Sequence, residues 1–283
     1  MKTGIHQHVF TSKLDETNLD FLNIIKDIGY DSVDINVRSI DIPTARIIKK
    51  HANGLGLTLM GGGSLPLDRE LLSKEKEKRR QAIKYMKDLI KVVVELDSDF
   101  YGGVIYSPCG FISGKAPTKE ELSFAAEGLL DAAKFAKKYG VRLGLEPVNR
   151  YETYILNTIE ATLGLIEKIG EENVGILYDT FHMNIEEKSF YSSITAAKDK
   201  IFHVHVNEND RGIPGTGHID WDEVFKALKD IDYRGVVAIE SFVDSSVDIS
   251  KAVCIWRKLS PSPRALASDG HSFIYKMVKK YGA

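Results

Sequence analysis

Four apolar, strand-like runs in the second half of the chain each end with a side chain that can bind a divalent metal ion. They are Leu143-Gly-Leu-Glu146, Gly175-Ile-Leu-Tyr-Asp179, Phe202-His-Val-His205 and Val237-Ala-Ile-Glu240. Parallel strands that run the same way would bring these four side chains to one rim of a barrel. Three carboxylates and one imidazole form a mostly hard ligand set, which suits Mn²⁺, Mg²⁺ or Co²⁺ better than a structural zinc. The pattern predicts a metal-dependent enzyme.

Each of these side chains has an ordinary structural alternative when it is taken alone. A carboxylate after a strand often caps a helix, and a histidine in a strand is often a hydrogen-bonded core residue. Neighbouring carboxylates without a cation, however, repel one another and raise each other's pKa. A cation removes that cost, so the set favours a metal site. His203 shares the inward face of His205 but lies ~7 Å deeper along the strand, and we expect it to pack or to support the ligand.

Two of the predicted ligands could also move protons. Glu146 and Glu240 come from the fifth and eighth strands, so they would approach a substrate from opposite sides of the metal. Such a pair can remove a proton from one face of a carbon and return one to the other face. A metal can polarise the neighbouring carbonyl and stabilise an enediolate. The expected result is inversion of the carbon next to a ketone.

The elements that would position these residues alternate along the whole chain. Strand-like runs lie near residues 4–10, 32–37, 57–63, 99–107, 141–147, 174–180, 201–207 and 236–242. Helical periodicity lies near residues 19–28, 44–53, 74–96, 119–139, 158–169, 192–198 and 221–230. Left-handed helix ends are expected at Gly29, Gly54, Gly140, Gly170 and Gly235. Eight such units predict an α/β protein with a (β/α)8 TIM-barrel fold.

No linker rich in Pro, Gly or Ser divides the sequence. We therefore expect residues 1–283 to form a single TIM-barrel domain, with a C-terminal helical extension over about residues 250–283. Apolar side chains in that extension, among them Trp256 and Ile274, would cover the barrel or form a subunit interface. A homodimer or homotetramer is expected.

The overall composition bears on the partners of the protein and on where it is found. Lys plus Arg is 38 and Asp plus Glu is 40, a net charge of −2, which disfavours a nucleic-acid partner. The two cysteines, Cys109 and Cys254, lie too far apart in sequence to form a CxxC motif. An apolar leader and a membrane-spanning run are both absent from the sequence. We expect a soluble, cytoplasmic protein without a membrane partner.

Three segments around the predicted ligands resemble a known family. They are Leu145-Glu-Pro-Val-Asn-Arg-Tyr-Glu152, Asp179-Thr-Phe-His-Met-Asn-Ile-Glu-Glu187 and His203-Val-His-Val-Asn-Glu-Asn-Asp-Arg211. These segments are similar to the ketose 3-epimerases that act on D-tagatose, D-allulose (psicose) and L-ribulose, within the xylose-isomerase-like barrels. The likeness continues through Pro214-Gly-Thr-Gly217, Trp221, Glu240-Ser-Phe242 and Ile255-Trp-Arg257, and is densest from residue 141 to 257.

The resemblance implies a role for each matched residue. Glu146, Asp179, His205 and Glu240 would bind one divalent ion per subunit, Mn²⁺ or Co²⁺ first and Mg²⁺ next, with Glu146 and Glu240 also as the acid/base pair. Glu152, His182 and Arg211 would hold the hydroxyls and carbonyl oxygen of a small-molecule ketose. The implied activity is inversion of C3 of a free ketose, of the D-allulose/D-fructose, D-tagatose/D-sorbose or L-ribulose/L-xylulose type.

The sequence also departs from the family pattern at several positions. Pro147 stands where many relatives carry Val, and Asn207 and Asp210 stand where Gly and Asn are common. The first strand carries His6 and His8 on one face, where several members place aromatic residues. His6 is expected to contact the far end of the sugar, with a packed barrel bottom as the alternative for both histidines. Cys109 is expected to be an inert loop thiol.

Three competing functions stay open at this point. A related isomerase or epimerase of a keto-acid or an inositol-derived sugar would use the same metal and glutamate pair. An endonuclease IV-like hydrolase of the same barrel type would need several clustered metal ions and a basic groove, which the charge balance disfavours. A carbohydrate-binding protein without turnover would have no use for two proton-transfer glutamates.

Overall fold

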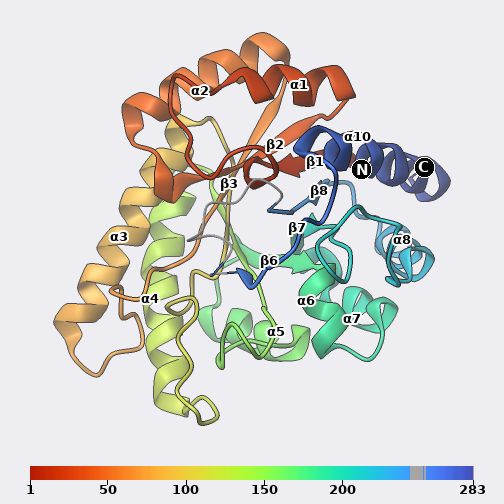
Figure 1. Cartoon of the computed structure of the whole chain (residues 1–283). Helices are drawn as coiled ribbons and strands as arrows, with labels where there is room; N and C mark the ends of the chain where they lie inside the picture. The colour runs from red at the N-terminus through yellow and green to blue at the C-terminus, as the bar shows by residue number, and fades with distance from the viewer. Residues whose placement is uncertain (243–250, 252, 283) are drawn as a thin grey trace.

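The computed structural model describes residues 1–242, 251 and 253–282, and its centre is a closed barrel of parallel strands (Figure 1). Consecutive strands pair in the order β1-β2-β3-β4-β5-β6-β7-β8, and β8 closes the barrel on β1. The strands are β1 Lys2–His6, β2 Ser32–Asn36, β3 Thr58–Gly62, β4 Phe100–Gly103, β5 Arg142–Leu145, β6 Val174–Asp179, β7 Ile201–His205 and β8 Val236–Ile239. The predicted TIM barrel is confirmed.

Helices surround the strands, as Figure 1 shows. They are α1 Asp20–Ile28, α2 Ile42–Leu55, α3 Lys76–Glu95, α4 Lys119–Lys137, α5 Ile159–Ile169, α6 Thr180–Glu186, α7 Phe190–Ala197, α8 Trp221–Asp230 and α10 Pro263–Tyr281, with short 3-10 helices η1 Gln7–Val9, η2 Val37–Ser39 and η3 Lys198–Lys200. The predicted first strand, 4–10, is too long because the chain turns into η1. Helix α6 was missed because it follows β6 without a loop.

Three of the five predicted glycine helix ends are confirmed. Gly29, Gly140 and Gly170 take positive φ just beyond a helix, as predicted. The prediction at Gly54 is wrong, because α2 continues to Leu55 and Gly56 is the left-handed cap with φ 65°. Gly235 is also wrong, since it is absent from the glycines with positive φ.

The barrel interior below the strand ends is filled by a small apolar cluster of Met60, Phe100 and Leu177. A Cβ on Gly102 would stand 2.5 Å from the Phe100 ring, and one on Gly144 2.6 Å from it. Glycine at both positions therefore leaves room for the aromatic ring. The Phe100 ring lies 5.1 Å from the ring of His203, so the cluster forms a floor under the polar side chains at the strand ends.

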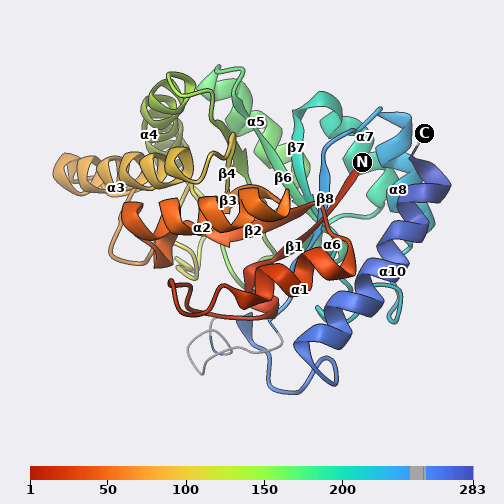
Figure 2. The ribbon, with the colours of Figure 1, turned by 90° about the horizontal axis from the view of Figure 1, so that it is seen from above.

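The predicted C-terminal extension includes a long helix, α10, that runs along the outside of the barrel against α1 and α8 (Figure 2). Ile274 is fully buried, and Phe273 packs edge-on against Trp221 with ring centroids 5.8 Å apart. These residues cover the barrel, whereas Trp256, 73% exposed, and Tyr275, 47% exposed, remain open on the surface of the described part of the extension. Over the described residues, every helix falls short of the length and hydropathy of a membrane span.

Candidate active site

The four predicted ligands meet where their strands end. Asp179 and His205 are register partners at the ends of β6 and β7, while Glu146 and Glu240 directly follow β5 and β8. His205 Nδ1 lies 3.8 Å from Glu146 Oε1, 3.7 Å from Asp179 Oδ2 and 3.8 Å from Glu240 Oε2. One ligand atom from each of the four residues lies within 4.8 Å of all the others. Four consecutive parallel strands thus gather the set, as the sequence predicted.

The donor atoms fit a divalent cation. His205 Nδ1 is buried and has no hydrogen-bond partner in the protein, although it faces three carboxylates. A buried polar atom without a partner costs free energy, and three carboxylates with one imidazole nitrogen are suitable ligands for Mn²⁺, Co²⁺ or Mg²⁺. The site therefore has the composition, the burial and the open donor that a metal centre requires.

His205 is oriented by a residue that the sequence analysis missed. Asp34, buried on β2, contacts His205 Nε2 at 3.0 Å and His203 Nε2 at 2.7 Å through the same oxygen. The carboxylate accepts from both rings and so leaves His205 Nδ1 free to face the ligand cluster. His203 supports the ligand in this way, as expected. Asp34, His203 and His205 are themselves close enough to be candidate ligands, but these short contacts are hydrogen bonds that leave no space for an ion between them.

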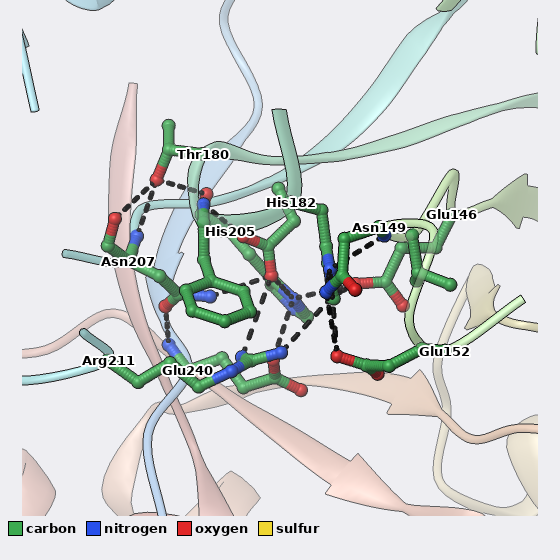
Figure 3. A network of polar contacts seen from close by, with 12 residues as sticks. Glu146, Asn149, Glu152, Thr180, His182, His205, Asn207, Arg211 and Glu240 are labelled. Carbon is green, nitrogen blue, oxygen red and sulfur yellow. Dashed lines mark hydrogen bonds and ion pairs between the residues drawn. The ribbon is translucent and has the colours of Figure 1, made fainter. Parts of the chain in front are cut away.

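A second support links the strands that carry Asp179 and Glu240. The buried Asn207 donates from Nδ2 to Asp179 Oδ2 over 2.7 Å, and its Oδ1 accepts from the backbone N–H of Glu240 over 2.7 Å. Thr180 accepts from the Asn207 N–H and donates to the Asn207 carbonyl (Figure 3). The other oxygen of Asp179 caps α6 by accepting from Phe181 N. One amide side chain therefore fixes two ligands from different strands.

The predicted substrate-binding residues form a chain of contacts beside the ligands (Figure 3). Arg211 Nη1 donates to Glu240 Oε2 over 2.6 Å, and Arg211 Nη2 lies 3.1 Å from His182 Nε2. On the other side of His182, Asn149 Nδ2 donates to Glu152 Oε1 over 2.9 Å. The Arg211 guanidinium lies 4.1 Å from the ring centre of Phe181 and 5.1 Å from that of Phe242. This packing holds the guanidinium in place.

The hydrogen bonds around His182 and His6 decide which ring nitrogen faces a substrate. The Asn149 N–H donates to His182 Nδ1, and the His8 N–H donates to His6 Nδ1. The neutral His6 ring then carries its hydrogen on Nε2, whereas Nε2 of His182 faces Arg211 Nη2, which can only donate. Burial lowers the pKa of His182, and burial with the neighbouring His8 lowers the pKa of His6 to about 3. His6 is therefore a neutral hydrogen-bond donor in the cavity wall, and the neutral His182 ring is held between the donors of Asn149 and Arg211.

The two glutamates have opposite electrostatic environments in the protein alone. Burial and the neighbouring charge of Glu240 raise the pKa of Glu146 well above its ordinary value. Burial also acts to raise the pKa of Glu240. The neighbouring Arg211 guanidinium and His205 outweigh this effect of burial and hold the pKa of Glu240 well below its ordinary value. Three carboxylates cannot all keep their charge at such short distances without nearby cations.

A cavity of about 490 Å³ opens above the ligand cluster. Its wall includes all the predicted site residues except the fully buried Asp179, namely His6, Glu146, Glu152, His182, His205, Arg211 and Glu240. The structure thus brings every predicted site residue together. Residues that the sequence analysis missed are Asp34, Arg38, Asn149, Thr180 and the supporting role of Asn207. A charged Asp34 in the middle of a strand was a signal that could have been used.

Two further residues near the cavity have structural roles. Burial, together with the charges of Glu152 and Glu146, raises the pKa of Cys109 to about 12, so this thiol stays protonated and unreactive at neutral pH, as expected. The buried Glu208 holds the loop after β7, because it accepts from the N–H groups of Gly215 and Ile219 and from the Trp221 indole. That loop positions Arg211, whose backbone takes φ 60°.

Known proteins share this fold and much of this sequence. The Xylose isomerase-like TIM barrel family model matches residues 22–277. The D-psicose 3-epimerase of Enterocloster bolteae is 32% identical over 278 residues, which cover 95% of this chain and 92% of that protein. An L-ribulose 3-epimerase structure superposes with a TM-score of 0.93 at 32% identity, over 99% of this chain and 95% of that one. The structure of the D-allulose 3-epimerase of a Methylomonas species in complex with D-allulose superposes with a TM-score of 0.92 at 28% identity. The match covers 98% of this chain and 97% of that one.

A match of this identity over the full length shows which family the chain belongs to. The chain belongs to the xylose isomerase-like TIM barrel family and, within it, to the carbohydrate epimerases.

The role of Asn207 can be tested by removing its side chain. In Asn207→Ala, Asp179 loses a donor and the Glu240 N–H loses its acceptor. Unsatisfied buried groups of this kind cost ~1–3 kcal/mol each, and loss of a partner behind a ligand weakens metal binding ~10–100-fold. We expect both effects, measured by denaturant unfolding and by Mn²⁺ titration calorimetry.

The matched control is Asn173→Ala. The Asn173 amide also makes two hydrogen bonds, to the carbonyls of Ala133 and Val141, but it contacts no ligand. This variant should lose stability and keep its Mn²⁺ affinity. Equal Mn²⁺ affinity in Asn207→Ala and the wild type would contradict the assigned role.

Proposed function

We propose that this protein is a metal-dependent epimerase that inverts C3 of a ketose through an enediolate. The observation that carries the proposal is the placement of Glu146 and Glu240 on strands β5 and β8, in one cluster with Asp179 and His205 and at the base of the same cavity. The relatives support the choice of substrate, because their names specify D-psicose, L-ribulose and D-allulose. Free ketoses of the D-allulose, D-tagatose and L-ribulose types are therefore the first substrates to assay.

Glu146, Asp179, His205 and Glu240 would hold one divalent ion, Mn²⁺ or Co²⁺ by first choice and Mg²⁺ next. When bound, such an ion supplies a Lewis acid for the substrate carbonyl and the oxygen beside it. The remaining work falls to the protein side chains. One glutamate takes the proton from C3, which leaves the enediolate, and the other glutamate gives a proton to the opposite face of C3. Proton removal and return balance, so no redox partner is needed.

The neighbouring side chains would orient the sugar. His182 presents its Nε2 edge to the cavity beside Arg211, and Arg211 presents its remaining guanidinium hydrogens beside Glu240. Glu152 would accept hydrogen bonds from a sugar hydroxyl while Asn149 holds one of its oxygens. His6 presents a donor from the opposite wall of the barrel. Converging donors and acceptors of this kind are what recognition of a polyol requires.

The competing functions fit the site less well. A nuclease of this barrel type would want clustered metal ions, but within the described part of the chain the second acidic group, Asp34 with His203 and His205, is closed by hydrogen bonds. A sugar-binding protein without turnover would not need two glutamates at the base of the cavity. The expected dimer or tetramer and the cytoplasmic location stay predictions.

Metal dependence can be tested by chelation. We expect a chelator to abolish epimerisation of D-allulose and Mn²⁺ or Co²⁺ to restore it, because the bound ion would supply the Lewis acid that proton removal beside a carbonyl requires. The melting temperature should also fall on chelation and rise again with metal, since a ligand that binds only the folded state stabilises it by ~2.7 kcal/mol at 100 times its Kd. Full activity in protein shown by elemental analysis to be metal-free would refute the mechanism.

Proton transfer can be tested at the two glutamates. Glu146→Gln and Glu240→Gln keep the side-chain size and one ligand oxygen but remove the ability to carry the proton. We expect kcat to fall by at least ~10²-fold in each variant, the lower end for general acid–base catalysis. Glu120→Gln, which changes an exposed glutamate on α4, serves as the control and should leave kcat unchanged. Wild-type kcat in either active-site variant, with metal content matched, would exclude the two-glutamate scheme.

A further inference from the structure

The end of the cavity away from the ligand cluster contains an arginine that the proposed mechanism does not use. Arg38 lies in η2, just beyond β2, and Ser64 follows β3, whereas the ligands come from β5 to β8. Both residues line the same cavity, together with the run Gly61, Gly62 and Gly63. A positively charged side chain therefore stands across the barrel mouth from the proposed reacting carbon.

Among the described residues, Arg38 has no carboxylate partner. Its guanidinium makes one hydrogen bond, from Nη1 to Ser64 Oγ over 2.8 Å. The other arginine of the cavity, Arg211, pairs with Glu240 at 2.6 Å. Arg46 and Arg150, which are exposed as Arg38 is, each pair with a glutamate. Most of the five N–H donors of Arg38 are thus available to a ligand.

The Arg38 side chain is exposed to the cavity mouth, and its neighbours position it. Its backbone N–H donates to Asn36 Oδ1, and its stem crosses Gly63, where an added Cβ would stand 3.2 Å from Arg38 Cγ and 3.5 Å from Cδ. Glycine at position 63 is what lets the stem lie there. Because Ser64 Oγ accepts from Arg38, the Ser64 O–H remains a donor. An arginine held in this way loses less entropy when it binds an anion.

The acidic residues of the cavity wall are all engaged elsewhere. Asp34 bonds His203 and His205, Glu152 accepts from Asn149, and Glu146 and Glu240 belong to the ligand cluster. The wall near Arg38 adds neutral groups instead. His8 contacts Asn36 at 3.1 Å, and Ser12 contributes a hydroxyl. Nothing negative in the described part of the wall therefore occupies the free guanidinium.

We propose that Arg38, with Ser64, forms an anion subsite that holds a carboxylate or phosphate on the part of the ketose remote from C3. Planar guanidinium groups bind both oxyanions through paired hydrogen bonds. The inference rests on the proposed function and makes ketoses with a terminal anionic group the preferred substrates of the same site, unlike the neutral sugars in the names of the relatives.

The direct test compares three ketohexoses that differ only at C6. D-fructose is neutral, D-fructose 6-phosphate carries a phosphate, and D-fructuronate carries a carboxylate. We expect kcat/KM for C3 epimerisation to be at least ~10-fold higher for one anionic sugar than for D-fructose, as a charge-assisted hydrogen bond provides. The anionic sugar with the higher kcat/KM shows whether the subsite prefers a phosphate or a carboxylate. Equal or higher kcat/KM for D-fructose overturns the proposal.

Arg38→Gln removes the charge and keeps a polar side chain of similar length. This variant should lower kcat/KM for the preferred anionic sugar by at least ~10-fold and change the value for D-fructose by less than ~3-fold. Arg80→Gln, on the exposed face of α3, makes the same change in net charge away from the cavity and should alter neither value. A loss that is equal for all three sugars would show that Arg38 is merely structural.

Binding measurements separate this inference from the proposed function. The two anionic sugars are titrated by calorimetry into Mn²⁺-loaded wild type and Arg38→Gln. If no ketose is epimerised but an anionic sugar binds only when Arg38 is present, the proposed function fails and the subsite stands. If D-fructose is epimerised and Arg38→Gln binds both anionic sugars as the wild type does, the function stands and the subsite is refuted. Absence of both turnover and Arg38-dependent binding refutes both.

Discussion

The repulsion between three buried carboxylates is the constraint on which the rest of the site depends. Glu146, Asp179 and Glu240 lie together with His205 in a group whose ligand atoms are all within 4.8 Å of one another. Burial makes such a cluster unstable unless positive charge is supplied. Arg211 supplies part of it through a 2.6 Å contact with Glu240, and the open Nδ1 of His205 marks where a divalent cation would supply the rest. The same charges that demand a cation also make the two glutamates suitable for moving protons.

The barrel stabilises this arrangement because its strands hold the four side chains at fixed positions at or directly after the strand ends. Asp179 and His205 are neighbours by strand register, and the apolar cluster of Met60, Phe100 and Leu177 closes the space beneath them. Side chains outside the ligand set then fix the orientation of each ligand. Asp34 orients the His205 ring through a hydrogen bond, and Asn207 joins Asp179 to the backbone of Glu240. A mutation behind the ligands can therefore disturb the chemistry as much as one among them.

The features predicted from the sequence were those that depend on local pattern. Alternating strands and helices predicted the barrel, and an ionisable residue after each apolar run predicted the four side chains that the structure brings together. What the sequence could not provide were contacts between distant segments, such as Asp34 with His203, which are separated by 169 residues. Helix α6 was missed for a local reason, because Asp179 both ends a strand and caps the next helix. Arg38 lies in a segment without any family motif, so only the cavity revealed it.

The central claim is that protons leave and return at C3 through carboxylates that exchange with water. The most direct measurement is NMR of the product ketose after epimerisation by the wild-type protein in D₂O. The account predicts solvent deuterium at C3 and none at C1. Quantitative retention of the original hydrogen at C3 would contradict exchange through the two glutamates, and deuterium mainly at C1 would instead identify aldose–ketose isomerisation.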